Sequence, residues 1–203
     1  TKSIDIYVEE KPTGEIYASA GVGTSGNSIG FGVRENNFMG NGVSLDTNFL
    51  ISTDAFKGKF LVTNPNYKNS DKSLFISAEA SENDNLERFG YKTNKTGMSV
   101  GTNFEYLNDF YLGINNSHFY EKIETNSTAS AMQKKQEGNY WDSFIRLDMN
   151  YDKRNQKFQT TSGFKSFYSL DLPIISDTST IKNYYNYSHY FDFFEKNFSS
   201  ISF

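Results

Sequence analysis

The chain has 203 residues, a net charge of −4 and no cysteine, and only 36% of its residues are apolar. The absence of cysteine excludes disulfides, thiolate catalysis and zinc sites built on cysteine. The charge provides no basic stripe, so nucleic acid is excluded as a partner, and no apolar run reaches the roughly 18 residues of a membrane-spanning helix.

The first predicted element is a strand over residues 3–10, in which Ile4, Ile6 and Val8 alternate with polar side chains. Pro12 and Gly14 interrupt this alternation. We interpret residues 1–13 as the end of an upstream domain with its linker, and residues 14–203 as a second unit.

From residue 15 onward, segments in which apolar and polar side chains alternate follow one another along the whole chain. The predicted strands cover residues 15–24, 28–36, 42–52, 55–63, 73–81, 96–105, 110–120, 142–152, 163–172 and 182–193, and another begins at residue 199. Short segments rich in Gly, Asn and Pro separate most of them, as in turns. The sequence therefore predicts an all-β fold made of one long antiparallel sheet.

The alternation also predicts which side chains share a face. The predicted apolar face carries Ile16, Ala18, Ala20, Val22, Ile29, Phe31, Val33, Val43, Leu45, Phe49, Ile51, Leu74, Ile76, Ala78, Ala80, Phe110, Leu112, Ile114, Ile145, Leu147, Met149, Tyr151, Tyr168, Leu170 and Leu172. The predicted polar face carries Ser19, Gly21, Arg34, Asp46, Asn48, Lys57, Lys59, Glu79, Asn103, Asn115, Arg146, Asp148, Asn150, Asp152, Lys165 and Asp171.

A soluble β-sandwich would show the same alternation, and strand length distinguishes it from a membrane barrel. The predicted strands have about 9 to 11 residues, the length that crosses a bilayer when tilted, whereas sandwich strands average about five or six. Aromatic residues gather near the strand ends, as in the belts of a barrel: Phe38, Tyr67, Tyr106, Phe158, Phe194 and Phe198 at one end, and Tyr91, Tyr120, Tyr140, Trp141 and Tyr184 at the other. The sequence therefore favours a transmembrane antiparallel β-barrel.

The lengths of the connections suggest how such a barrel is oriented. Tight turns are predicted after every second strand, and long polar loops are predicted over residues 82–95 and 122–139. Short turns are periplasmic and long loops are external in bacterial barrels.

Several stretches resemble the BamA family of outer-membrane protein assembly factors. They are Val8-Glu9-Glu10-Lys11-Pro12-Thr13-Gly14-Glu15, Ala20-Gly21-Val22-Gly23-Thr24-Ser25-Gly26-Asn27-Ser28-Ile29-Gly30-Phe31-Gly32-Val33, Glu35-Asn36-Asn37-Phe38-Met39-Gly40-Asn41-Gly42, Val62-Thr63-Asn64-Pro65, and Tyr151-Asp152-Lys153-Arg154-Asn155 with Thr161-Ser162-Gly163. The last turn differs from the family in having Gln159-Thr160-Thr161 where Phe-Pro-Thr is usual.

This resemblance implies a barrel preceded by periplasmic POTRA domains, with residues 1–13 closing the last of them. Residues 14–203 would supply about ten to eleven of an expected sixteen strands, so we expect a part of a longer protein. The implied function is the folding and insertion of other barrel proteins in the outer membrane of a Gram-negative bacterium. The implied partners are the lipid bilayer, unfolded outer-membrane protein clients and, through the POTRA domains, accessory lipoproteins.

The glycines of the first hairpin allow two interpretations. Gly21, Gly23, Gly30 and Gly32 could relieve crowding where the sheet bends. Alternatively, a first strand with few side chains packs weakly, separates from its neighbour and templates an incoming strand. The predicted lateral-seam strand comprises Glu15, Ile16, Tyr17, Ala18, Ser19, Ala20, Gly21, Val22, Gly23 and Thr24.

We predict no catalytic residue, cofactor or metal site. His118 and His189 have no acid or nucleophile at a recognisable spacing, Ser25 lies in a hairpin, and the acidic residues near Glu82 and Glu87 lack the spacing of a calcium loop. The alternatives are a related exporter, such as a two-partner secretion transporter or a translocation-assembly module, a passive porin or barrel-embedded hydrolase, and a soluble adhesin.

Overall fold

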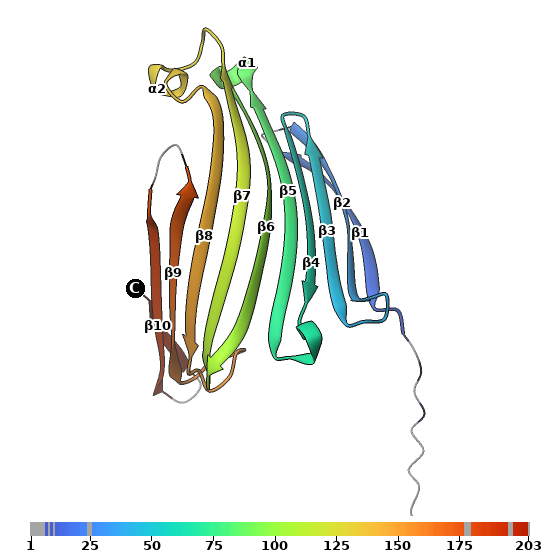
Figure 1. The fold of residues 1–203 in the computed structure, drawn as a ribbon, viewed down its shortest axis with the longest axis vertical. Coiled ribbons are helices and arrows are strands. Elements are labelled where there is room, and N and C mark those ends of the chain that lie inside the picture. Colours follow the sequence, from blue (N-terminus) through green and yellow to red (C-terminus); the bar gives the residue numbers. More distant parts are fainter. Residues whose placement is uncertain are drawn as a thin grey trace, which may run out of the picture.

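The structure is a computed structural model that describes residues 7, 9, 11–23, 26–176, 180–194 and 197–202; residues 193, 194 and 197–202 are described by their backbone alone. The 11 strands among these residues form one antiparallel sheet, in which each strand pairs with the next along the chain (Figure 1). The first and last strands are therefore the two edges of the sheet. The predicted all-β antiparallel fold is confirmed.

The strands occur in the predicted order along the chain. The strands are β1 (Gly14–Gly23), β2 (Gly26–Phe38), β3 (Val43–Ser52), β4 (Ala55–Asn64), β5 (Lys72–Asn85), β6 (Tyr91–Leu107), β7 (Phe110–Thr125), β8 (Gly138–Asp152), β9 (Gly163–Ile175), β10 (Lys182–Phe194) and β11 (Asn197–Ser202). Short helical segments lie in three connections: η1 (Tyr67–Asn69), α1 (Leu86–Phe89) and α2 (Ala131–Lys134). Among the described residues, no helix is long and apolar enough to cross a membrane.

The strand register keeps apolar residues on one face across the sheet. Directly opposed residues of antiparallel strands have their side chains on the same face. Ile114 on β7 lies opposite Leu147 on β8, which in turn lies opposite Leu170 on β9. On the other face Arg146 lies opposite Asp171. The predicted division into an apolar and a polar face is confirmed.

The apolar face is not covered by a second layer within the described residues. No large side chain among them is fully buried, and Ile29, Ile76 and Met98 expose 62%, 53% and 64% of their surface. A sheet in water normally buries its apolar face against another element. This face therefore requires apolar surroundings.

Two aromatic belts border the apolar face. Near α1 and α2, the rings of Tyr120 and Trp141 lie 5.0 Å apart, and at the other end Phe110, Tyr151 and Phe164 meet edge to face at 6.1 and 5.4 Å. Ten residues separate Phe110 from Tyr120 on β7, which corresponds to about 34 Å along the strand and about 24 Å across a bilayer at a tilt of about 45°. The belts are thus spaced as the apolar band of a membrane barrel requires.

Three residues that we predicted for the belts lie on the polar face instead. Tyr91 lies opposite Thr125, Tyr140 opposite Glu121 and Tyr184 opposite Ser169, all on that face. Their nearness to a strand end suggested a belt position, but the two-residue alternation of the strand decides the face on which a side chain lies.

The central strands are longer than their alternation predicts. β6 has 17 residues and β7 has 16, whereas β1 has 10. Most of residues 82–95 extend β5 and β6 instead of forming the predicted long loop. Of residues 122–139, only 122–125 and 138–139 are in strands, and residues 126–137 form the predicted long connection, which contains α2. Beyond the belt the apolar face becomes charged: Lys92 pairs with Glu82 and Asp84 at 2.7 and 3.1 Å. The contrast between the faces disappears there while the backbone pairing continues.

Two further expectations concern segments outside regular strands. The turn predicted after the eighth strand is a longer connection over residues 153–162. Of residues 1–13, the structure describes residues 7, 9 and 11–13, none of them in a strand, and the rest of the predicted strand over 3–10 lies outside the described residues. The assignment of residues 1–13 to an upstream domain stays a prediction.

Candidate functional site

The first strand, β1, is an exposed edge of the sheet. All ten of its residues are exposed, and in the sheet it pairs with β2 alone. It contains nine of the ten residues of the predicted seam strand: Glu15, Ile16, Tyr17, Ala18, Ser19, Ala20, Gly21, Val22 and Gly23. Thr24, the tenth, lies outside the described residues.

On the polar face, a glycine occurs in every pair between β1 and β2 beyond residue 15. These pairs are Tyr17–Gly32, Ser19–Gly30, Gly21–Ser28 and Gly23–Gly26. A pair of side chains directly opposed across two strands contributes about 0.2–1 kcal/mol relative to alanine, and a glycine removes that contribution. The backbone hydrogen bonds therefore carry most of the attachment of β1 on this face.

The charged side chains that hold β1 on the polar face lie at its beginning. Arg34 on β2 contacts Glu15 at 3.3 Å and Asp46 on β3 at 3.2 Å, and the hydroxyl of Thr13 donates to Glu35. The Arg34 and Glu15 side chains are exposed by 50% and 63%, and such a pair contributes less than about 1 kcal/mol. The attachment of β1 therefore weakens toward Gly23.

One hydrogen bond shows which backbone groups of β1 face away from β2. The Asn36 N–H donates to the carbonyl of Thr13 at 3.3 Å, so these two residues form a hydrogen-bonded pair. Such pairs recur at every second residue of an antiparallel ladder, which assigns the odd-numbered residues of β1 to bonds with β2. The N–H and C=O groups that point to the open edge belong to Gly14, Ile16, Ala18, Ala20 and Val22.

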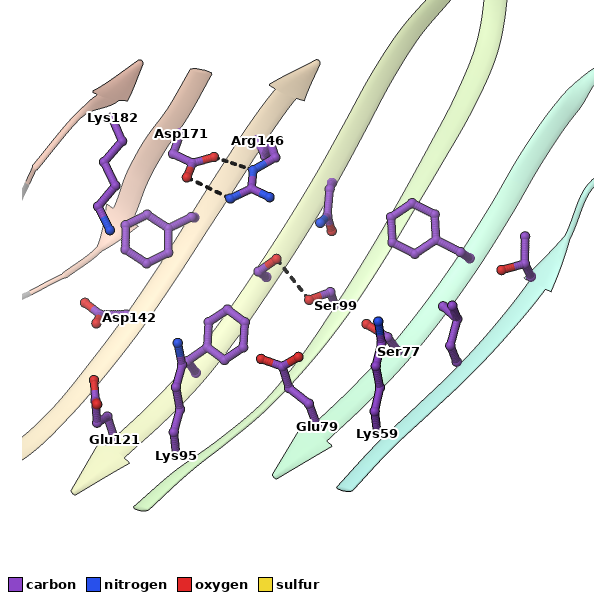
Figure 2. A pocket seen from close by; sticks show the side chains of 17 residues that line it. Lys59, Ser77, Glu79, Lys95, Ser99, Glu121, Asp142, Arg146, Asp171 and Lys182 are labelled. Atoms are coloured by element: carbon purple, nitrogen blue, oxygen red, sulfur yellow. Dashed lines mark hydrogen bonds and ion pairs between the residues drawn. The ribbon is translucent and has the colours of Figure 1, made fainter. Parts of the chain in front are cut away.

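The polar face carries a second concentration of functional groups, on the wall formed by β4 to β10. A hollow of about 740 Å³ there is lined by four basic and four acidic side chains: Lys59, Lys95, Arg146, Lys182, Glu79, Glu121, Asp142 and Asp171 (Figure 2). Arg146 donates to both carboxylate oxygens of Asp171, at 2.6 and 2.9 Å. The charges are balanced, as expected for a wall facing water rather than an ion-selective site. Among the described residues, no group of three or more His, Cys, Asp or Glu side chains could hold a metal ion.

The comparison with known proteins gives the family. The Omp85 superfamily domain matches residues 37–203. The chain belongs to the Omp85 superfamily.

A comparison with solved structures found 61 matching chains. One is the crystal structure of BamA from Haemophilus ducreyi lacking POTRA domains 1-3, with a TM-score of 0.73 and 23% identity over 93% of this chain. The chain spans 39% of the length of that relative. The fold is therefore that of part of a transmembrane antiparallel barrel, whose apolar face meets lipid and whose polar face lines the lumen. A search of curated proteins found no match.

The sequence motif after β8 has a structural role in this Omp85 chain. Lys153 donates to Asp109 at 2.7 Å, which ties two turns together and raises the pKa of Lys153. The side-chain oxygen of Asn155 accepts from the Thr161 N–H at 3.1 Å. Gly163 has a φ of +103°, and a Cβ there would lie 2.1 Å from the carbonyl oxygen of Lys153. These residues shape the connection over 153–162.

The histidines do not form a recognisable catalytic arrangement. His118 Nδ1 lies 2.7 Å from the hydroxyl of Ser143, but Ser143 is only 5% exposed. His189 stacks beside Tyr187 and Phe191 at 6.4 and 6.0 Å. Ser25 lies outside the described residues.

Two glycines on β2 provide a test of how closely the first hairpin is packed. A Cβ at Gly32 would lie 2.5 Å from the carbonyl oxygen of Thr47 and 2.4 Å from the ring of Tyr17. At Gly30 it would meet chiefly the movable hydroxyl of Ser19. We expect Gly32→Ala to lower the free energy of unfolding by about 1–3 kcal/mol, and Gly30→Ala to change it little.

The measurement is a urea titration of the folded full-length protein in lipid, with the two variants compared in parallel. Gly30→Ala serves as the matched control, since both glycines lie on the same face of one strand. Equal unfolding midpoints would show that Tyr17 and Thr47 do not confine Gly32.

Proposed function

We propose that this chain forms part of an outer-membrane assembly factor that folds and inserts other barrel proteins. The observation that carries the proposal is the composition of the first hairpin, in which a glycine occurs in every polar-face pair between β1 and β2 beyond residue 15. A strand with few pairs of opposed side chains loses few side-chain contacts when it parts from a neighbour. Membership in the Omp85 superfamily supports this choice.

The proposed mechanism is the addition of a client strand to the open edge of β1. The N–H and C=O groups of Ile16, Ala18 and Ala20 point to that edge and would pair with an incoming strand. Main-chain hydrogen bonds do not depend on the side chains of the client, so clients of different sequence can use the same edge. The client's own burial in the bilayer would supply the free energy, and we propose no catalytic residue or cofactor.

The remaining assignments follow from the same proposal. The protein would reside in the outer membrane of a Gram-negative bacterium, in contact with the bilayer and with unfolded outer-membrane protein clients. Residues 1–13 would close the last POTRA domain, and accessory lipoproteins would bind through such upstream domains. Residues 14–203 would be the amino-terminal part of the barrel.

Cysteine crosslinking during client insertion tests the proposal, since these 203 residues contain no native cysteine. Single cysteines replace Ile16, Ala18, Ala20 or Val22 in the full-length protein, paired with single cysteines along the terminal strand of a stalled client. We expect each position to crosslink to one client position, and the partner to move along the client strand in equal steps.

Two control positions separate assembly from export. A cysteine at Ile76, in the middle of the sheet on the lipid face, should crosslink little because it has strands on both sides. A cysteine at Ser77 samples the lumen wall. Crosslinks that concentrate at Ser77 and bypass β1 would contradict strand addition and favour an exporter.

A further inference from the structure

A groove on the lipid face lies outside the first hairpin. Its volume is about 620 Å³, and its lining comes from β3 to β8. The outward side chains along its floor are small, namely those of Gly58, Ala78, Ala80 and Thr96. Larger apolar side chains stand on both sides of the floor: Phe49, Phe56, Phe60, Met98, Tyr120 and Trp141. The groove is therefore a depression between bulky apolar side chains.

The position of the groove within the apolar band is defined by the aromatic belt. Tyr120 and Trp141 both line the groove and form the belt near α1 and α2. Ala80 on β5 and Thr96 on β6 lie opposite each other at the level of this belt. The next pair on the same face, beyond the belt, is Glu82 and Asn94, where the charged residues begin. The groove thus starts at the level of the lipid ester groups and runs into the hydrocarbon layer.

A polar group lies in the part of the groove close to this aromatic belt. His118 lines the groove, and its Nδ1 lies 2.7 Å from the hydroxyl of Ser143. Ser143 is 5% exposed, so its hydroxyl is held beneath the surface. When this hydroxyl donates to Nδ1, the neutral imidazole carries its proton on Nε2, which is then a donor for an acceptor in the groove.

We propose that this groove is a binding site for one membrane lipid, with an acyl chain on the small-residue floor and its ester carbonyl accepting a hydrogen bond from His118 Nε2. The groove is continuous with the lipid-facing surface, so an acyl chain is the occupant that its surroundings supply. A chain lying in it contacts residues on both sides, whereas a chain on a flat wall contacts residues on one side.

The charges above the groove indicate that the lipid headgroup contributes little to recognition. The Lys92 ammonium already contacts Glu82 at 2.7 Å and Asp84 at 3.1 Å. A phosphate would have to compete with two carboxylates for this cation. Recognition therefore rests on the chain and its ester, and lipids with different headgroups should bind alike.

Fluorescence quenching of Trp141 tests the site, because this tryptophan lines the groove. The full-length protein is placed in bilayers that contain a small fraction of phosphatidylglycerol with brominated acyl chains. Subtracting the signal of Trp141→Phe isolates the contribution of this residue. We expect quenching well above the value for random mixing, because the groove retains one chain.

Variants that fill the groove provide the structural control. Ala78→Phe places a ring on the floor, and the excess quenching should fall to the random-mixing value. Ile76→Phe adds a ring on the same strand and face, outside the groove, and should keep the excess. Random-mixing quenching in the unsubstituted protein, or equal quenching in both variants, would show lipid contact of the ordinary annular kind and overturn the proposal.

An ether lipid tests the hydrogen bond without altering the fold. Replacing the brominated ester lipid by its ether analogue removes the carbonyl, and binding should weaken about fivefold, the effect of one hydrogen bond. In His118→Phe the two lipids should bind equally. Equal binding of the ester and ether lipids by the unsubstituted protein would exclude the role of His118.

Discussion

Replacing Leu147 by arginine is expected to lower the free energy of unfolding of the full-length barrel by about 2–4 kcal/mol, the cost of a basic side chain near the bilayer midplane. Leu147 lies between Ile114 and Leu170 on neighbouring strands, within the apolar face and between the two aromatic belts. The guanidinium would lie in the apolar layer, and the residues directly opposite it, Ile114 and Leu170, carry no acidic group. The cost is measured by a reversible urea titration in lipid vesicles.

The control places the same charge on the lumen face. Ser169 lies opposite Asp148, the residue that follows Leu147, and borders a polar hollow of the lumen wall with Arg146 and Asp171. We expect Ser169→Arg to be nearly neutral, since its charge meets water and the Asp148 carboxylate. Equal losses for the two variants would contradict the assignment of the faces.

The strands and their faces could be predicted from the sequence because the bilayer imposes a strict contrast between neighbouring residues. The alternation of Ile145, Leu147 and Met149 with Arg146 and Asp148 needs no knowledge of the partner strands, and the register later placed each set on the predicted face. Because this contrast is between residues that are adjacent in the sequence, it can be recognised without knowledge of the structure.

The same reasoning failed where the contrast ends. Lys92 and Asn94 lie on the lipid side of β6 but beyond the belt, and polar residues there occupy both faces. Residues 82–95 therefore read as a loop although most of them are in β5 and β6, whereas most of residues 122–139 do lie outside strands. Tyr184 was assigned to a belt from its nearness to a strand end, although its face follows from the pairing with Ser169.

The candidate seam was only partly predictable. The glycines of the first hairpin are visible in the sequence, but their arrangement opposite Tyr17 and Ser19 depends on the register between β1 and β2. The register also shows that each polar-face pair beyond residue 15 lacks at least one side chain. The groove of Gly58, Ala78 and Thr96 combines residues of three strands and could not be read from any one of them.

A proline at Ala20 is expected to reduce the rate of client insertion about tenfold or more, equivalent to ~1.4 kcal/mol or the loss of one to two hydrogen bonds. The Ala20 N–H points to the open edge, and proline has no N–H. Because the bonds to β2 come from the odd-numbered residues, the hairpin keeps its own ladder, as is usual for proline in an edge strand.

Two controls separate this effect from a general loss of folding. Ala20→Val changes the side chain on the same face but keeps the N–H, and insertion should proceed nearly as before. Ser19→Pro removes a donor to β2 instead, so it should lower the stability of the hairpin itself. Resistance of the folded barrel to unfolding at room temperature in detergent shows which variants are intact.

The most direct measurement of strand addition at β1 is therefore the insertion rate of one barrel client into liposomes that contain the full-length protein with Ala20→Pro or Ala20→Val. Strand addition predicts slow insertion with the folded proline variant and near-normal insertion with the valine variant. Normal insertion by a folded Ala20→Pro protein would contradict the account, and the glycines of the first hairpin would then serve only to bend the sheet.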